Sequence, residues 1–242
     1  AKNISFFSMR TKTDADRVLG LGVDPEKVRV NGNIKFDVLV SGEDISPLEN
    51  QESIWVVFGS TRPGDEGVVM ETIIKLSQEH PRLKFVIAPR HLERLREVKE
   101  LMVAYGIEFQ LHSERLGSGN SRLVLLDRLG ELNKYYAKAC LAFVGGGFNP
   151  RFGGQNIIEP ASYGLPVVFG KHMNNFEEEA RLLVESGGGI QLNNPEELHG
   201  VLNQLLADQE KRQRLGKKAW ETVVKNRGAV NKTIELITRL AN

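Results

Sequence analysis

Residues 54–66 have the sequence IWVVFGSTRPGDE. The first five, Ile54–Phe58, are β-branched and aromatic without polar alternation, which is typical of a strand buried on both faces. The residues Gly59–Gly64 are small or turn-forming, and Asp65 and Glu66 suit the first turn of a helix, where the helix dipole favours acids. The stretch predicts a strand, a turn and a helix over about 64–79, which is the repeating unit of a parallel α/β sheet.

The same alternation continues along the chain. Short apolar runs predict further strands at Val28–Val30, Leu83–Ala88, Leu123–Leu126, Leu141–Val144, Pro166–Phe169 and Gly189–Leu192. Amphipathic stretches predict helices at about 92–105, 131–139, 156–163 and 175–186. The runs lack polar alternation, so helices should cover both faces of the sheet. The predicted fold class is α/β, a Rossmann-like doubly wound parallel sheet.

The two ends of the chain follow a different pattern. Residues 195–208, 210–225 and 229–241 predict helices without strands between them, and we expect these helices to brace the domain. Near the start, Thr13 is predicted to be the N-cap of a helix that ends at Gly20. The polar stretch 41–53 predicts a linker, so residues 1–40 and 54–242 are expected to belong to different units.

The composition limits the class of protein. Of 242 residues, 40% are hydrophobic and 26% charged, as in ordinary globular domains. The formal net charge of +1 gives no electrostatic case for a nucleic-acid binder. The single cysteine, Cys140, cannot form an internal disulfide and favours a reducing compartment. No apolar run approaches the ~18 residues of a membrane span, so we expect this chain to be soluble. It begins at Ala1 rather than Met, and we expect it to be processed or cut from a longer chain.

The turn Gly59–Glu66 imitates a P-loop in the spacing of its glycines. Small residues before a helix expose backbone N–H groups that attract phosphate or carboxylate. Asp65 and Glu66, however, stand where a P-loop has Lys and Ser or Thr, and they would repel a triphosphate. An NTPase is therefore rejected. Two interpretations remain, an anion site and an ordinary turn whose acids cap the helix.

A second glycine-rich turn follows the predicted strand Leu141–Val144. It holds Gly145–Gly147 and Gly153-Gly154, and the G-x-G-x-x-G fingerprint of dinucleotide binding fails at Pro150. Asn156 and Glu159 have the spacing of a capping box, which is the structural alternative. So many glycines cost conformational entropy that a structural loop does not need. The turn is therefore predicted to serve a pocket, in which Glu159 could hold a ribose diol.

Two further strand ends carry candidate ligand contacts. Arg90 follows one strand, where it could hold a phosphate or be an ordinary solvated side chain. The segment Asp127–Leu132 follows another strand, and Gly130 could expose backbone to the edge of a nucleobase. Because the carboxyl ends of parallel strands lie at one edge of a sheet, we expect the four turns to meet at one site.

No metal site and no hydrolase site are predicted. The five histidines lack the spacings of metal ligands, and the acids of Asp14-Ala15-Asp16 suit helix capping. The sequence also lacks a G-x-S-x-G elbow and a C-x-x-C pair.

In order and spacing, these motifs resemble the 3-deoxy-D-manno-octulosonic acid (Kdo) transferases of lipopolysaccharide synthesis. The matching segments are residues 30–37, GSTRPGDE, APRHLER, DRLGEL, AFVGGGF, GGQNIIEPASYGLPVVFG and Asn175-Phe176. The resemblance covers only the second half of that family. It implies the C-terminal lobe of a GT-B glycosyltransferase, with residues 1–40 as a remnant of the N-terminal acceptor domain and 54–242 as the nucleotide-sugar-binding domain.

The resemblance also implies site residues. Nucleotide contacts are implied at Pro89, Arg90, Leu129, Gly130, Leu132, Gly153, Gly154, Asn156 and Glu159. In that scheme Arg90 lies near the phosphate, Leu129–Leu132 read cytosine through the backbone, and Glu159 holds the ribose. Sugar contacts are implied at Gly59, Ser60 and Glu66. No cofactor and no metal are implied.

The implied reaction is inverting transfer of Kdo from CMP-Kdo to a lipid A precursor, at the cytoplasmic face of the bacterial inner membrane. In the family, the catalytic base, the acceptor surface and the membrane anchor lie in the other half. We therefore expect this chain to bind the donor and to transfer nothing by itself. It departs from the family at Arg62, Leu92 and Gln155, where His, Pro and His are common.

Two other interpretations remain open. One is another GT-B enzyme that uses a UDP-sugar, a transferase or a 2-epimerase, which would share the glycine loop and the ribose-binding Glu. The other is a non-catalytic nucleotide-binding module. Comparing the affinities of the chain for CMP and for uridine nucleotides tests the first alternative. Measuring CMP affinity after substitution of Arg90 or Glu159 tests the second.

Overall fold

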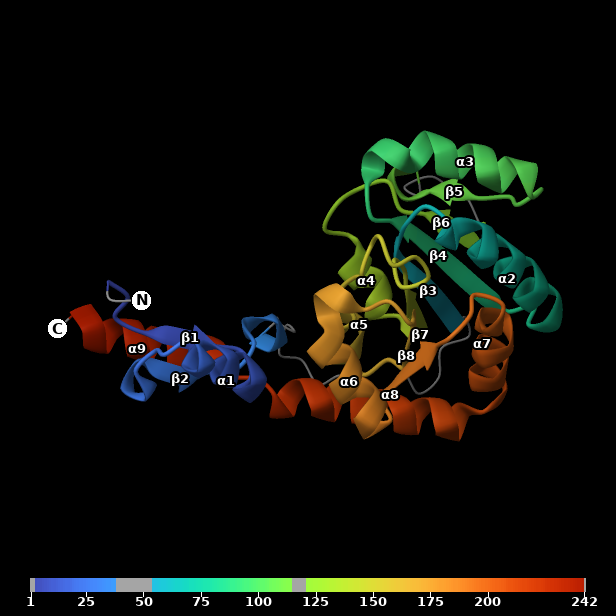
Figure 1. Cartoon of the computed structure of the whole chain (residues 1–242). Helices are drawn as coiled ribbons and strands as arrows, with labels where there is room; N and C mark the ends of the chain where they lie inside the picture. Colours follow the sequence, from blue (N-terminus) through green and yellow to red (C-terminus); the bar gives the residue numbers. More distant parts are fainter. Residues whose placement is uncertain (1–2, 38–53, 115–120, 242) are drawn as a thin grey trace. The chain divides into compact units, whose positions relative to one another are not determined.

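The computed structural model describes residues 3–37, 54–114 and 121–241 (Figure 1). The chain divides into two compact units, one that combines residues 1–43 with 223–242 and a larger one of residues 44–222. The predicted linker, residues 41–53, lies outside the described residues. Within the described ranges, no helix combines the length and the apolarity that crossing a bilayer requires.

The larger unit is built on a parallel sheet (Figure 1). Its strands are β3 (Ile54–Thr61), β4 (Leu83–Pro89), β5 (Gln110–Leu111), β6 (Leu123–Leu125), β7 (Ala139–Val144), β8 (Val167–Gly170) and β9 (Gly189–Leu192). They lie in the order β5-β6-β4-β3-β7-β8-β9, and each neighbouring pair is parallel. The order reverses between β3 and β7. Such a switch point opens a crevice at the carboxyl ends of the strands, and the predicted doubly wound α/β class is confirmed.

The helices of this unit cover both faces of the sheet. They are α2 (Asp65–Glu79), α3 (Leu95–Ala104), α4 (Leu132–Tyr136), α5 (Ile158–Ser162), α6 (Glu177–Ser186), α7 (Glu197–Ala207) and α8 (Gln209–Lys225), with short 3-10 turns η3 (Leu92–Arg94), η4 (His112–Glu114) and η5 (Asn174–Phe176). Alternate residues of β3 point to opposite faces. Phe58 is buried in the core that α2, α3 and α7 share, whereas Val57 is buried in the core that contains Tyr135 and Tyr136 of α4. Burying one such side chain stabilises the fold by about 1.5–3 kcal/mol.

The carboxyl end of β3 departs from the predicted strand. The strand continues past Phe58 to Thr61, and its register against β4 shifts between Gly59 and Thr61. Ser60, inside this bulge, has φ 53 and is the one non-glycine residue of the described chain with positive φ. Bulges re-aim side chains at strand ends, and residues held in a sparsely populated region of φ/ψ space cluster at ligand sites. The short edge strand β5 was not predicted.

The smaller unit holds a two-stranded parallel sheet and three short helical segments near the start of the chain. These are β1 (Phe7–Met9), β2 (Val28–Val30), α1 (Lys12–Gly20), η1 (Pro25–Lys27) and η2 (Ile34–Asp37). The predicted N-cap at Thr13 is wrong. The side chain of Thr11 accepts the hydrogen bond from the backbone N–H of Asp14, because α1 already begins at Lys12 and the cap lies outside it.

The last helix, α9 (Ala229–Ala241), packs against η2 in the same unit. The carboxylate of Asp37 accepts hydrogen bonds from the backbone N–H groups of Gly228, at 2.6 Å, and Val230, at 2.8 Å. Asp37 thus satisfies donors that a helix start leaves unpaired. The first and last described segments of the chain therefore belong together.

Candidate functional site

A pocket of about 170 Å³ lies at the carboxyl ends of β3, β4 and β6. Seven of the sequence-predicted site residues line it, namely Ser60, Pro89, Arg90, Leu129, Gly130, Leu132 and Glu159. The other lining residues are Ala88, Leu92, Leu126, Arg128 and Asn133. Pockets that enclose a whole drug-sized ligand measure about 300–1,000 Å³, so this one suits one part of a larger ligand. The predicted residues Gly59, Glu66, Gly153, Gly154 and Asn156 lie outside its lining.

Arg90 is held at both its backbone and its side chain. Its N–H donates to the carbonyl of Thr61 at 3.0 Å, which ties the end of β4 to the end of β3. Its Nε donates to Oε1 of Gln155 at 3.1 Å. The guanidinium is otherwise exposed at the pocket. An arginine oriented in this way can hold a phosphate with two parallel hydrogen bonds.

Leu129, Gly130 and Leu132 supply the apolar wall of the pocket. Leu129 is 76% exposed although it is a large apolar residue, and it lines the pocket. Gly130 follows with φ 82, a conformation that a side chain would strain. Exposed apolar surface beside accessible backbone suits a nucleobase, which offers a flat face and a hydrogen-bonding edge.

Glu159 lies in the first turn of α5, half-buried at the pocket. Burial raises the pKa of its carboxyl, while a hydrogen bond from the Asn133 side chain and the charge of Arg90 act in the opposite direction. The capping-box alternative is wrong, because α5 begins at Ile158 and Ile157, which has no side-chain cap, occupies the N-cap position. The Asn156 side chain instead accepts from the N–H of Ile158 at 3.1 Å.

Asn133 is a pocket residue that the sequence did not reveal. Its side chain donates to Glu159. Its Oδ1 atom is buried and has no hydrogen-bond partner within the described ranges. A buried acceptor without a partner costs stability, and this one lies in the pocket wall. Asn133 is the second residue of α4, where its position gives no signal of a ligand contact.

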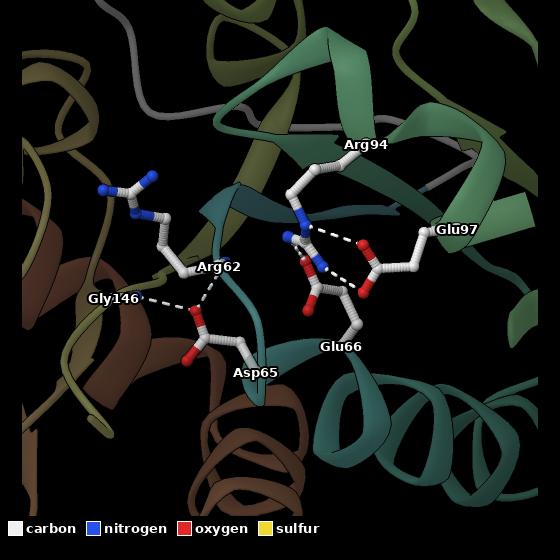
Figure 2. A network of polar contacts seen from close by, with 6 residues as sticks. All are labelled: Arg62, Asp65, Glu66, Arg94, Glu97 and Gly146. Atoms are coloured by element: carbon white, nitrogen blue, oxygen red, sulfur yellow. Dashed lines mark hydrogen bonds and ion pairs between the residues drawn. The ribbon is translucent and has the colours of Figure 1, made fainter. Parts of the chain in front are cut away.

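Asp65 joins the turns on the two sides of the switch point (Figure 2). It is 1% exposed, and its Oδ2 atom accepts from the backbone N–H of Arg62 at 2.8 Å and of Gly146 at 2.7 Å. Burial raises the pKa of this carboxyl to about 6, and the two N–H donors oppose the shift. Asp65 therefore fixes the β3–α2 turn against the glycine loop and does not present its charge to solvent.

Asp65→Asn is expected to change how stability depends on pH. The folded-state pKa of about 6 lies above the ordinary value of 3.8, so the folded chain binds this proton more tightly than the unfolded chain. The stability that this tighter proton binding contributes is complete below pH 3.8 and is lost as the pH rises through about 6. The difference between the two pKa values corresponds to at most about 3 kcal/mol in the free energy of unfolding. Asparagine can accept both N–H bonds but does not titrate.

The free energy of unfolding of Asp65→Asn, relative to the unsubstituted chain, should therefore rise between about pH 4 and 7. Urea unfolding of both proteins across this range measures it, since the other carboxyl groups cancel in the difference. A difference that stays constant with pH would contradict this account of Asp65.

Glu66 is committed to an ion pair inside the same turn (Figure 2). Its side chain is 4% exposed, and its Oε1 lies 2.7 Å from Nη1 of Arg94. Nη2 of Arg94 bonds Glu97 at 2.9 Å. Glu66 thus ties α2 to η3, the segment that follows Arg90.

The glycines of the second turn have structural reasons that the entropy argument overlooked. A Cβ on Gly145 would lie 2.5 Å from Oδ2 of Asp65, so this glycine permits the close approach of the two turns. Gly153 has φ 64, and a Cβ there would lie 2.8 Å from Nδ2 of Asn175. The Asn175 side chain in turn donates to the carbonyl of Phe152 at 2.8 Å. The glycine content therefore reflects packing and does not by itself indicate a pocket.

No three His, Cys, Asp or Glu side chains of residues 3–37, 54–114 and 121–241 gather as metal ligands would.

Comparison with known proteins gives relatives that include several enzymes of one name. No family model matches the chain. The 3-deoxy-D-manno-octulosonic acid transferase of Haemophilus influenzae is 31% identical over 242 residues, which cover 97% of this chain and 56% of that protein. The enzyme of the same name from Chlamydophila psittaci is 33% identical over 195 residues, 76% of this chain and 43% of that protein. The chain spans about half the length of the curated relatives it matches.

One solved structure agrees with these relatives, and others share the fold. The C-terminal CMP-Kdo binding domain of WaaA from Acinetobacter baumannii is 25% identical, with a TM-score of 0.66 over 72% of this chain and 90% of that one. TarM of S. aureus, at 14% identity, a TM-score of 0.62, and coverage of 98% of this chain and 44% of that one, shares the fold alone. The predicted C-terminal lobe of a GT-B glycosyltransferase is confirmed as a fold. The chain belongs to the 3-deoxy-D-manno-octulosonic acid (Kdo) transferase family, and it matches the C-terminal, nucleotide-sugar-binding half of that family.

Proposed function

We propose that this chain binds CMP-Kdo and forms the donor half of an inverting glycosyltransferase. One observation carries the proposal: a single pocket joins Arg90, the exposed segment Leu129–Leu132 and Glu159. These supply a cation, an apolar wall with accessible backbone, and a carboxylate. They correspond to the phosphate, the base and the ribose of a nucleotide. The Acinetobacter baumannii domain that this chain resembles is a CMP-Kdo binding domain, which supports the choice of ligand.

In this proposal Arg90 and Pro89 meet the phosphate end of the nucleotide, while Leu129, Gly130 and Leu132 read the cytosine. Glu159 accepts hydrogen bonds from the ribose hydroxyls, and Asn156 supports the start of α5 beneath it. Gly153 and Gly154 approach the phosphate from the glycine loop. On the far side of the phosphate, the turn that contains Gly59, Ser60 and Glu66 faces the sugar.

The chemistry that the chain contributes is electrostatic. When the bond between Kdo and CMP breaks, negative charge builds on the departing phosphate, and a fixed cation such as Arg90 stabilises it without reorganisation. Transfer also needs a base to take the proton of the acceptor hydroxyl. We propose that this base, the lipid A precursor site and the association with the inner membrane belong to the half of the family's chain that residues 1–242 do not match.

We also propose a division of the chain that follows from this function. Residues 1–40 are assigned to the end of the acceptor-binding domain, residues 41–53 to the linker, and residues 54–242 to the donor-binding domain with its terminal helices. The last of these helices, within residues 223–242, shares a compact unit with residues 1–43.

Calorimetric titration of the chain with CMP, UMP and UDP tests the proposal. CMP should bind about tenfold or more tightly than UMP, because the backbone contacts along Leu129–Leu132 would leave unpaired groups against the wrong base edge. Equal or tighter binding of UMP or UDP would favour a UDP-sugar enzyme. Binding of none of the three would refute a nucleotide site in this pocket.

A further inference from the structure

Arg62 stands in the β3–α2 turn with its guanidinium over the ring of Phe152, at 4.7 Å from Cζ to the ring centroid. Phe152 belongs to the glycine loop. The Nε atom of Arg62 is buried and has no hydrogen-bond partner in the part of the chain that the structure describes. Stacking on an aromatic face holds a guanidinium in place. A buried donor left without a partner is costly, so the position of this side chain calls for a partner outside residues 54–114 and 121–222.

The acids of its own turn do not supply that partner. The Oδ2 of Asp65 takes two backbone N–H groups, and Glu66 pairs with Arg94. Figure 2 shows the guanidinium of Arg62 directed away from both carboxylates. The turn contains two acids beside one arginine, yet its outward charge is positive because both acids are buried and already bonded.

Arg62 lies near the second arginine of the site. A Cβ built on Gly146 would be 3.4 Å from Cγ of Arg62 and 3.2 Å from Cγ of Gln155. Gln155 in turn accepts a hydrogen bond from Nε of Arg90 at 3.1 Å. Gln155 therefore bonds Arg90 and lies near the stem of Arg62. The two arginines directly follow neighbouring strands, β3 and β4.

We propose that Arg62 binds the carboxylate of the donor sugar while Arg90 binds the phosphate, so that Arg62 determines specificity for a nucleotide-linked sugar acid. The inference rests on the proposed function. In a 2-keto sugar acid such as Kdo, the anomeric carbon bears both the carboxylate and the oxygen that leads to the phosphate. The donor therefore presents two anions side by side. A planar guanidinium matches a carboxylate in a bidentate geometry, which a neutral sugar cannot satisfy.

The test compares two ligands, CMP and freshly prepared CMP-Kdo, in titrations of the 242-residue chain. Arg62→Met keeps a long apolar stem for packing on Phe152 and removes the charge. It should weaken CMP-Kdo binding about 10- to 100-fold and change CMP binding less than about twofold. Arg62→Lys should fall between, because lysine keeps the charge but loses the fork. Arg90→Ala should weaken both ligands.

Arg96 offers a matched control, since its side chain is 91% exposed and pairs with Glu100 along α3. Arg96→Met should change neither affinity. Thermal unfolding of each variant verifies that it is folded, and the ratio of the two affinities in a single variant is independent of any partial loss of folded protein.

The outcomes separate the two proposals. If Arg62→Met weakens CMP and CMP-Kdo equally, or weakens neither, the assignment of Arg62 to the carboxylate is overturned. The same holds if the unsubstituted chain binds CMP-Kdo no more tightly than CMP, although CMP binding would then still support the proposed function. If the unsubstituted chain binds neither ligand, both proposals fail.

Discussion

Arg94→Met is expected to destabilise the chain by about 3–5 kcal/mol, because it would leave the Glu66 carboxylate buried without its counter-charge. The side chains of Glu66 and Arg94 are 4% and 15% exposed, and their closest atoms are 2.7 Å apart. Water cannot replace the guanidinium at such a site. Glu97, at 2.9 Å from the other arm of Arg94, loses its partner too, but it is 66% exposed and can be hydrated. Urea unfolding monitored by circular dichroism measures the loss.

Arg96→Met is the control two positions along the chain. Arg96 pairs with Glu100 on the exposed surface of α3, and such pairs contribute about 0–1 kcal/mol. Adding Glu66→Gln to Arg94→Met should recover part of the lost stability, since it removes the buried charge. If Arg94→Met costs no more than Arg96→Met, the pair does not hold the turn and η3 together as described.

The double variant Arg90→Ala/Glu159→Ala is expected to lower CMP affinity by roughly 100-fold to 10,000-fold. Each side chain makes charge-assisted hydrogen bonds to the ligand in the proposed arrangement, Arg90 to the phosphate and Glu159 to the ribose, and each such contact contributes about 1.5–3 kcal/mol. In the free chain the two side chains have different hydrogen-bond partners, Gln155 and Asn133, although the charge of Arg90 also acts on the Glu159 carboxyl. Calorimetric titration of the single and double variants measures the effect.

Removal of the exposed pair Arg181 and Glu178 on α6 provides the control, because it changes the same two residue types on the surface. The double variant Arg181→Ala/Glu178→Ala should bind CMP as the unsubstituted chain does. If Arg90→Ala/Glu159→Ala retains CMP affinity, the chain is better described as a binding module whose ligand lies elsewhere.

The strand pattern predicted most of the larger unit, and the physical reason is burial. A strand covered on both faces is largely apolar. Ile54–Phe58 carries that signal without a polar residue, and Leu83–Ala88 carries it with one half-buried lysine, Lys84. The edge strand β5, Gln110–Leu111, has two residues, one of them polar, and its pairing with β6 is decided by the sheet and not by its own sequence. The cap of α1 at Thr11 was missed because Thr11 and Thr13 are equally good cap residues.

The sequence predicts which turns form the site, but it does not predict which residues of those turns contact one another. Gly59, Arg90, Gly130 and Glu159 were recognisable because each lies near the end of a strand or the start of a helix. The contacts that organise them join residues distant in sequence. Asp65 bonds Gly146 across 81 positions, and Asn133 bonds Glu159 from a separate helix. No local pattern encodes such pairs, so the sequence alone predicts neither the burial of the acids of the turn nor the close packing that the glycines permit.

We expect CMP to occupy the pocket at the ends of β3, β4 and β6. A crystal structure of this chain grown with CMP would show whether it does. In that crystal structure the cytosine should lie against Leu129–Leu132, the ribose hydroxyls within hydrogen-bond distance of Glu159, and the phosphate at Arg90. CMP bound at another surface, or bound here with its phosphate away from Arg90 and its ribose away from Glu159, would contradict this expectation.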